Sequence, residues 1–388
     1  MSLRIPDRLG GRAAIAGIGA TEFSKDSGRS ELALAAEAVR AALADAGLRP
    51  GEVDGLVTFT MDTSPEITLA QAVGIGELSF FSRVHYGGGA ACAVVQQAAL
   101  AVATGTAEVV VCYRAFNERS GRRFGAGAQR HQPSAEGVAL GWVLPFGLLT
   151  PASWVAMTAR RYLHVHGLRP EVFGRVAVSC RRYAATNPAA YFYGRPLTLA
   201  EHAASRWIAE PLRLLDCCQE TDGGLALVVT SLERARDLRH SPAVIRAAAQ
   251  GAGHAQEMMT GFYRADIASL PELGVVGRQL WRSTGLGPSD VQVAILYDHF
   301  TPFVLMQLEE LGFCGPGEGA EFVAEDVLPL NTHGGQLGEA YLHGMNGIAE
   351  AVRQLRGTAV NQVAGAANVL VTAGTGVPTS GLLLGADG

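Results

Sequence analysis

Apolar residues follow two patterns along the first half of the chain. Short, fully apolar runs are typical of strands buried on both faces, whereas residues 31–46 place apolar side chains at helical spacing. Ser30 directly precedes this predicted helix, where its hydroxyl can accept a hydrogen bond from a first-turn amide. An alanine-rich stretch at 90–103 predicts a second helix. The predicted strands are 13–16, 56–59, 109–112 and 225–229.

The second half repeats the order of the first. Residues 47–54, Gly-Leu-Arg-Pro-Gly-Glu-Val-Asp, recur at 285–292 as Gly-Leu-Gly-Pro-Ser-Asp-Val-Gln. In both copies a glycine ends a helical stretch, a proline starts a short turn, and an apolar strand follows. A helix is then predicted from Gly344 to about residue 355. The predicted strands of this half are 293–296, 369–372 and 382–384.

This repetition predicts an α/β protein built from two tandem halves, residues 1–235 and 236–388. Two βαβαβ-type halves, each with a buried sheet between helices, imply a five-layered α/β/α/β/α sandwich. Residues from about 117 to 216 fit neither half and hold many arginines and aromatics. We interpret them as an inserted cap domain, because such loops commonly carry substrate contacts. Which of these arginines would contact a substrate is left open.

Composition narrows the functional classes. Hydrophobic residues make up 48% of the 388 positions and charged residues only 17%, so we expect a partner or subunit to cover part of the surface. The net charge of −5 argues against nucleic-acid binding. The six cysteines lack metal-ligand spacing, so no metal site is predicted. With no secretory signal and no apolar run of the ~18–20 residues that span a membrane, we expect a cytoplasmic protein.

Glycine-rich segments of the chain carry a resemblance to a known family. The run 331–335 reads Asn-Thr-His-Gly-Gly, and Tyr341 follows it six residues after Gly335. Together with the Asp-Gly-Gly block at 222–224 and the Ser-Gly pair at 380–381, this run resembles the Asn-x-x-Gly-Gly signature of the thiolase superfamily. The resemblance covers essentially the whole chain and implies the thiolase fold.

The chain departs from the thiolase pattern at the nucleophile. Thiolases need a reactive cysteine at the start of a buried helix, where the helix dipole favours the thiolate. Alignment of that helix places Gly88 at this position, and Cys92 lies one helical turn further in. We therefore interpret Cys92 as a buried structural thiol. Gly88 would let a bulky ring system approach the backbone.

Two tyrosines take the positions that hold the thioester oxygen in thiolases. Tyr341 replaces the histidine of a Gly-His-Pro motif, and Tyr297 replaces an asparagine or histidine at the head of the run Tyr-Asp-His-Phe. The C-terminal cysteine motif is also missing, since residues 372–381 contain no cysteine. Retro-aldol cleavage of a β-hydroxyacyl-CoA forms the same enolate without an acyl-enzyme. Two phenols can supply the base and the hydrogen-bond donors that it needs, and which tyrosine does which is left open.

Three further runs narrow the resemblance to one branch. Residues 85–91 (His-Tyr-Gly-Gly-Gly-Ala-Ala), 113–120 (Tyr-Arg-Ala-Phe-Asn-Glu-Arg-Ser) and 373–378 (Ala-Gly-Thr-Gly-Val-Pro) resemble the lipid-transfer-protein-type aldolases of bacterial steroid degradation. This resemblance implies that Tyr297 and Tyr341 cleave a 17-hydroxysteroid CoA thioester to a 17-ketosteroid and propionyl-CoA. It also implies a homodimer that binds a small zinc-ribbon and OB-fold protein in a heterotetramer-like complex. CoA enters as part of the substrate, so no separate cofactor is predicted.

Residues near the two tyrosines are candidates for supporting roles. Asp298 either orients a neighbour or caps the next helix. His299 either relays protons or is a hydrogen-bonded structural residue, and the role of His343 is undecided. The glycines expected near the substrate are Gly88, Gly334, Gly335 and Gly381.

Three alternatives to a steroid aldolase stay open. The protein could be a thiolase that uses Cys92 as its nucleophile. It could be an aldolase or thiolase for another acyl-CoA, such as a branched or aromatic β-hydroxyacyl thioester. It could also be a non-catalytic lipid-binding or scaffold subunit that only stabilises a partner.

Overall fold

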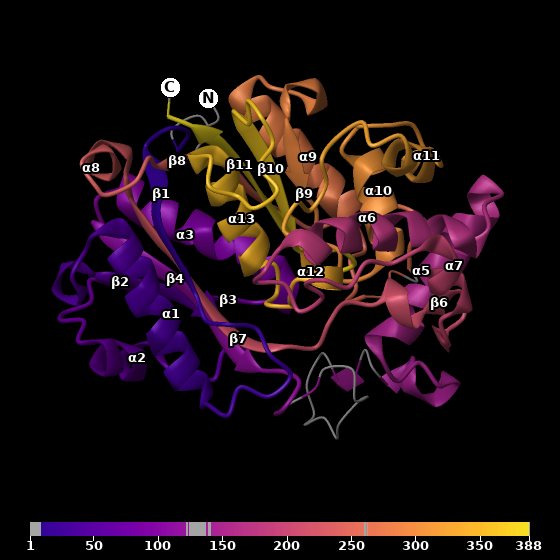
Figure 1. Ribbon diagram of the computed structural model, residues 1–388, viewed down its shortest axis with the longest axis horizontal. Helices are drawn as coiled ribbons and strands as arrows, with labels where there is room; N and C mark the ends of the chain where they lie inside the picture. The colour runs from indigo at the N-terminus through magenta and orange to yellow at the C-terminus, as the bar shows by residue number, and fades with distance from the viewer. Residues whose placement is uncertain are drawn as a thin grey trace.

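Most strands of the protein form one continuous sheet, and two short strands pair separately from it. The computed structural model describes residues 9–121, 123, 137–138, 141–259, 261 and 263–387. Nine strands in this part of the chain pair in the order β3-β2-β4-β7-β1-β8-β11-β10-β9 (Figure 1). Their bounds are β1 Ala13–Ala20, β2 Gly55–Phe59, β3 Phe80–Val84, β4 Val109–Asn117, β7 Asp222–Ser231, β8 Ala243–Gly251, β9 Val293–Ile295, β10 Asn368–Ala373 and β11 Thr379–Ala386.

The strand order shows the predicted tandem repeat. β1, β7, β4 and β2 are adjacent in the first half, and β8, β11, β10 and β9 are adjacent in the same sense in the second. The halves meet where β1 and β8 pair antiparallel, with Ala14 opposite Val244. A parallel bridge between Ala294 and Leu330 extends the second half beyond β9, in the place that β3 takes in the first.

Helices complete the five layers. α3 (Ala91–Ala103) and α13 (Met345–Arg356) form the central layer, because each contacts strands of both halves. α1 (Glu31–Ala46) and α2 (Glu66–Val73) cover the outer face of the first half, and α9 (Pro271–Thr284) covers that of the second (Figure 1). Apolar residues from both halves pack into one central core around α3 and α13. The predicted five-layered α/β architecture is therefore confirmed.

The repeated segment forms the same local structure twice. Ser30 Oγ accepts a hydrogen bond from Ala33 N at 3.2 Å and begins α1, as its predicted N-cap role requires. Gly47 ends α1 at φ 76°, and Gly285 ends α9 at φ 72°, both in the left-handed region that favours glycine. In each copy a short 3₁₀ turn follows the glycine, at Pro50–Glu52 and at Pro288–Asp290.

The chain between β4 and β7 forms its own helices. They pack toward the second half, where α6 contacts α10 (Thr301–Glu310), α11 (Gly319–Ala324) and α12 (Gly335–Gly338). The described residues of this segment include α5 Pro151–His166, α6 Phe173–Thr186, α7 Leu199–Ala204, β5 Trp207–Ala209 and β6 Leu212–Arg213. Its arginines at 122 and 130 lie outside the described residues. The predicted boundaries at 117, 216 and 235 stay predictions.

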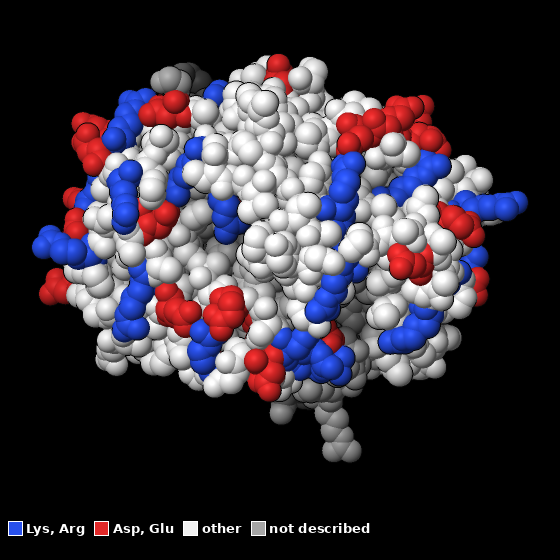
Figure 2. All heavy atoms as spheres, in the orientation of Figure 1, with Lys and Arg blue, Asp and Glu red and all other residues white. Residues whose placement is uncertain are grey.

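Charged side chains are mixed on the surface. On the face shown in Figure 2, basic and acidic groups are interspersed around the rim, and the centre is largely uncharged. This mixture agrees with the low charge content of the sequence. Within the described ranges, no helix is both long and apolar enough to cross a membrane. The predicted cytoplasmic location stays a prediction.

Candidate active site

The two predicted catalytic tyrosines meet at one cavity. Tyr297 follows β9, and Tyr341 lies on the loop between α12 and α13. Their hydroxyl oxygens are 3.2 Å apart, within hydrogen-bond distance. Both side chains line a cavity of about 1110 Å³ that reaches the surface. The fold therefore joins two phenols that are 44 residues apart in the chain.

Tyr297 fills the space where a thiolase nucleophile would stand. A Cβ atom added to Gly88 would lie 1.8 Å from the Tyr297 hydroxyl oxygen, so no larger residue fits there. Gly344 lies on another side of the same ring, and a Cβ on it would be 3.1 Å from Tyr297 Cδ2. Gly88 thus acts by giving room to the phenol.

Cys92 is buried away from the cavity. Its thiol lies inside α3 and donates a hydrogen bond to the carbonyl oxygen of Val371 at 3.7 Å. Burial raises the pKa of Cys92 far above that of an ordinary thiol, so the unreactive protonated form dominates. This geometry supports the structural interpretation of Cys92 over a nucleophilic one.

A ring of hydrogen bonds fixes the backbone of Tyr297. Its N–H donates to Thr372 Oγ1 at 2.9 Å, and its carbonyl accepts from Gln307 Nε2 at 2.8 Å. Thr372 in turn donates to Gln307 Oε1 at 2.6 Å. Asn331 holds the preceding residue, Leu296, through bonds to both its N–H and its carbonyl. The phenol is therefore carried by a rigid strand end.

Asp298 holds the glycine-rich loop. Its carboxylate accepts hydrogen bonds from Gln336 N at 2.8 Å and Leu337 N at 3.3 Å. Gly335 allows this approach, because a Cβ on it would lie 1.9 Å from Asp298 Oδ2. Gly334 has φ 110° and packs against Ala184. Although the amides oppose the shift, burial raises the pKa of Asp298 to about 6.

Four of the candidate supporting residues are not part of the cavity wall. The first three, Asp298, Gly334 and Gly335, form the support under the Tyr341 loop. Gly381 lies inside β11, where a Cβ would be 2.8 Å from Val276 Cγ1 of α9. Gly334, Gly335 and Gly381 therefore lie outside the cavity that we expected them to line, whereas Asp298 was expected only to orient a neighbour or to cap the next helix. The three glycines are needed because the backbone packs closely at their positions. A sequence motif alone does not distinguish such packing from contact with a ligand.

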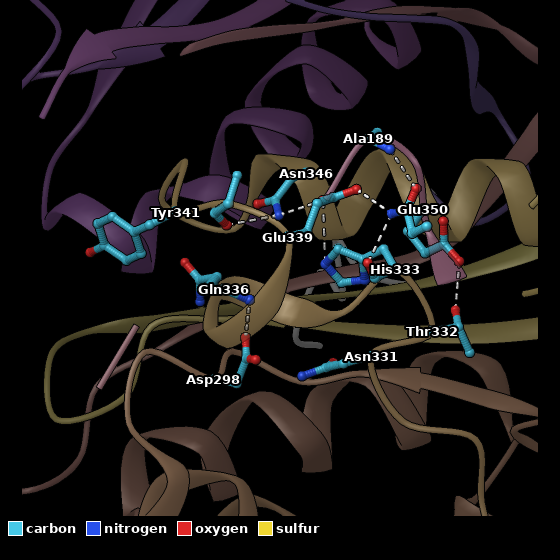
Figure 3. Close-up of polar contacts among 12 residues, drawn as sticks. Ala189, Asp298, Asn331, Thr332, His333, Gln336, Glu339, Tyr341, Asn346 and Glu350 are labelled. Atoms are coloured by element: carbon cyan, nitrogen blue, oxygen red, sulfur yellow. Dashed lines mark hydrogen bonds and ion pairs between the residues drawn. The ribbon is translucent and has the colours of Figure 1, made fainter. Parts of the chain in front are cut away.

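A buried polar network supports the rest of the Tyr341 loop (Figure 3). Glu339 accepts hydrogen bonds from Asn346 Nδ2 at 2.9 Å and Asn187 Nδ2 at 3.0 Å. Burial raises the pKa of Glu339 to about 7 and lowers that of His333, 3.9 Å away, to about 3. In Figure 3 the Tyr341 ring points away from this network. The network thus holds the loop and leaves the phenol in the cavity.

Two histidines line the cavity as neutral imidazoles. The His299 ring stacks on Phe303 with centroids 5.1 Å apart, and burial lowers its pKa to about 3. His343 Nδ1 accepts a hydrogen bond from Arg114 Nε at 3.2 Å, which places the imidazole proton on Nε2. Burial, with the Arg114 charge adding to it, lowers the pKa of His343 well below its usual value.

Arg114 and Asp62 form an ion pair behind His343 that the motifs did not predict. Arg114 is fully buried, and its Nη1 lies 3.1 Å from Asp62 Oδ2. Its guanidinium also lies over the Phe116 ring, 4.2 Å from the centroid, and that ring stacks on His343. A charged residue inside an otherwise apolar strand was the available signal, because a buried arginine needs a partner.

Burial defines the protonation state of the tyrosine pair. It raises the pKa of Tyr297 and of Tyr341 well above the ordinary phenol value, and each is also affected by Glu118 and Cys218. Both phenols are consequently protonated near neutral pH. Protonated phenols are hydrogen-bond donors, and two donors facing one cavity can stabilise a developing oxyanion.

The cavity wall includes two further groups of residues, of which the first was not predicted. Glu118, Cys217 and Cys218 lie on its wall. Burial raises the pKa of Cys217 to about 12, and that of Cys218 well above the usual range, so both are thiols. Cationic side chains also contribute to the lining, namely Lys25, Arg119, Arg123, Arg195 and Arg206. In the part of the chain that the structure describes, no three His, Cys, Asp or Glu side chains are arranged to hold a metal ion.

Comparison with known proteins places the chain in a family. Residues 247–383 match a family model described as thiolase C-terminal domain-like. A steroid side-chain-cleaving aldolase of Thermomonospora curvata is 68% identical over 98% of this chain and 99% of its own length. A Mycobacterium tuberculosis protein named 17-hydroxy-3-oxo-4-pregnene-20-carboxyl-CoA lyase is 66% identical over 97% and 100%.

Solved structures agree with this relationship. An Ltp2-ChsH2(DUF35) aldolase matches with a TM-score of 0.94 and 68% identity, over 98% of this chain and 99% of that one. Human mitochondrial 3-ketoacyl-CoA thiolase has a TM-score of 0.70 at 17% identity, over 98% and 100%, and shares the fold. The chain belongs to the steroid side-chain-cleaving aldolases of the thiolase superfamily and is a carbon–carbon lyase.

Proposed function

We propose that the protein cleaves the side chain of a 17-hydroxysteroid CoA thioester, giving a 17-ketosteroid and propionyl-CoA, with Tyr297 and Tyr341 as its catalytic pair. The observation that carries the proposal is the 3.2 Å contact of a buried phenol, Tyr297, with a partly buried one, Tyr341, in the place of the thiolase nucleophile and oxyanion site. The name of the M. tuberculosis relative supplies the substrate class. CoA takes part only as a portion of the substrate.

The proposed reaction is a balanced retro-aldol cleavage. The C17 hydroxyl loses its proton, and its oxygen forms a carbonyl as the bond from C17 to the side chain breaks. The bond electrons pass to the thioester enolate, and its α-carbon takes up a proton to give propionyl-CoA. The tyrosine hydroxyls hold the enolate oxygen or pass the proton, and a preorganised donor of this kind contributes about 3–4 kcal/mol. No free CoA or oxidant is consumed.

Size and charge of the cavity support a steroid thioester. Its volume of about 1110 Å³ is slightly larger than the ~300–1,000 Å³ of most small-molecule sites. Apolar side chains such as Phe116, Phe300 and Met259 line it together with the cations at Lys25 and Arg195. Apolar walls suit fused rings, and cations suit the phosphates of CoA.

The proposed assembly is a homodimer with a small zinc-ribbon and OB-fold partner. The matching Ltp2-ChsH2(DUF35) aldolase carries DUF35 in its name, which supports such a partner. Exposed apolar side chains offer surfaces for both contacts. Phe81 on edge strand β3 is 67% exposed, and Phe146 before α5 is 81% exposed. Light scattering on the co-expressed proteins should give two copies of each chain, and a lone 40.6 kDa species would contradict this assembly.

Mass spectrometry of the reaction products tests the proposed function. The co-expressed complex is supplied with a 17-hydroxysteroid side-chain CoA thioester in the absence of free CoA. We expect equal amounts of a 17-ketosteroid and propionyl-CoA. Cleavage that required added CoA and released an acyl-CoA two carbons shorter would instead indicate a thiolase. Turnover of other β-hydroxyacyl-CoA esters at equal rates would contradict the steroid specificity.

A further inference from the structure

The tyrosine pair lacks a proton acceptor of its own. Retro-aldol cleavage begins with loss of the hydroxyl proton, which needs a base matched to neutral pH. Burial raises the pKa of both Tyr297 and Tyr341, so neither is a tyrosinate under these conditions. Another group on the cavity wall must therefore take the proton.

Most titratable groups on or next to the cavity wall are held in other hydrogen bonds or ion pairs, or are weak bases. Asp298 accepts two backbone hydrogen bonds and supports the loop from outside the cavity. His343 Nδ1 is occupied by Arg114. His299 is held neutral by burial, and a pKa of about 3 makes it a weak base. Glu220 forms an ion pair with Arg123 at 2.7 Å.

Glu118 has the geometry of a base. It follows β4 in the run 113–120, is only 3% exposed, and lines the cavity. Its Oε2 atom has no hydrogen-bond partner among the described residues, although it is buried. A buried carboxyl oxygen without a partner is rare, because leaving it unsatisfied destabilises the folded protein.

Thr221 ties this carboxyl to the tyrosine pair. The Thr221 backbone N–H lies close enough to the Glu118 carboxyl to lower its pKa. The same residue holds Tyr341, because Thr221 Oγ1 accepts from Tyr341 N at 2.9 Å and donates to Tyr341 O at 3.2 Å. The charge of Glu118 also acts on both phenols. The carboxyl and the two hydroxyls thus form one cluster on the cavity wall.

Resting on the proposed function, we propose that Glu118 is the general base of the cleavage and acts through the tyrosine pair. The substrate hydroxyl gives its proton to a tyrosine oxygen while the proton of the pair passes through a water in the cavity to the Glu118 carboxylate. The C17 carbonyl forms and the side-chain bond breaks to the enolate. The same proton then returns through the pair to the α-carbon, so that Glu118 ends as it began.

The electrostatic surroundings of Glu118 fit this role. Burial raises its pKa well above that of an ordinary glutamate, and the neighbouring Glu220 raises it further. Arg114 and Lys25 act in the opposite direction. A carboxylate whose pKa is raised binds a proton more strongly than an ordinary glutamate does, which suits a general base. The charged and titratable groups that face it are Lys25, Arg114, Cys218, Glu220, Tyr297 and Tyr341.

The test compares Glu118→Gln with the wild-type complex. The amide keeps the size of the side chain but cannot accept the proton. We expect kcat to fall about 100–1,000-fold with KM within about threefold, and the fall of kcat/KM at acid pH to disappear. Glu118→Asp keeps a carboxylate, so it should retain part of the activity and the acid limb even if the amide variant folds poorly.

Glu310→Gln is the matched control. Glu310 is a partly buried carboxyl with a raised pKa that is not part of the cavity lining, so kcat should change less than about twofold. The proposal is overturned if Glu118→Gln keeps a third or more of the activity, or if its acid limb is unchanged. Failure of the wild-type complex to release propionyl-CoA would overturn the proposed function, and this proposal with it.

Discussion

The turns that lead into α3 and α13 occupy matching places in the two halves of the molecule. Before α3, Tyr86 and Gly87 have φ values of 76° and 49°. Before α13, His343 and Gly344 have φ values of 52° and 86°. In each half a ring-bearing residue and a glycine take the left-handed conformation and direct a central helix into the core. The same type of turn therefore precedes the central helix of each half.

What surrounds the two turns is different. The first is followed by Gly88 and Gly89, where added Cβ atoms would lie 1.8 Å from Tyr297 and 2.0 Å from Pro378 O. The second is preceded by the Tyr341 loop, held by Glu339 and its buried hydrogen bonds. At these turns the first half thus provides space, and the second half provides the loop that carries the Tyr341 phenol. In a repeated fold, one copy of a turn can thus keep small residues that leave space for a side chain, while the other copy is held in place by buried hydrogen bonds.

The largest effect is expected from removing the hydroxyls that the second half supplies. Tyr341→Phe and Tyr297→Phe each lose one preorganised donor, so kcat should fall about 100–1,000-fold with little change in fold. Steady-state kinetics and circular dichroism measure both. Tyr263→Phe is the control, because Tyr263 is 77% exposed and should keep full activity. Near-normal activity in both active-site variants would contradict the proposed pair.

Filling the space in the first half should have the next largest effect. In Gly88→Ala the methyl group meets the Tyr297 hydroxyl, so the phenol must move and kcat should fall about 100-fold. The free energy of unfolding should drop by about 1–3 kcal/mol from overpacking, as measured by urea denaturation. Gly51→Ala is a matched control with open space around its Cβ. An unchanged kcat in Gly88→Ala would show that this space is not needed.

The support of the second turn predicts a pH-dependent effect on stability. Burial raises the pKa of Glu339 from 4.5 to about 7, so the folded state holds a proton that the unfolded state releases first. Wild-type stability should fall as pH rises from about 4.5 to about 7, relative to Glu339→Gln. The difference between the two unfolding free energies should shift by on the order of 3 kcal/mol across this range. A difference that stays constant with pH would contradict the assignment.

The smallest effect is expected from substitution of Cys92, which is buried in α3 of the first half. Cys92→Ser removes the thiol but keeps a group that can donate to Val371 O, so kcat should change less than about threefold. Iodoacetamide should likewise leave activity intact over the time in which free thiols react. Loss of activity in Cys92→Ser would instead support a covalent, thiolase-type mechanism in which Cys92 is the nucleophile.

Sequence predicted the framework better than the surroundings of the site. Hydrophobic spacing and the repeated Gly-Pro segments located the helices and strands, because local patterns determine these elements. The aligned motifs singled out Tyr297, Tyr341 and Gly88, and all three line the cavity. The roles of Arg114 and Glu118 could not be predicted, because the pairing of a buried charge depends on residues distant in sequence, such as Asp62 and Thr221.

The pairing of β1 with β8 also determines when the site can form. β1 ends at residue 20 and β8 begins at residue 243, so more than two hundred residues must be synthesised before the strands can meet. At about 5–20 residues per second, this takes some tens of seconds on the ribosome. Tyr297 and Tyr341 leave the ribosome later still. Until the second half has been synthesised, β1 of the nascent first half therefore lacks its partner strand β8, and the cavity lacks both tyrosines.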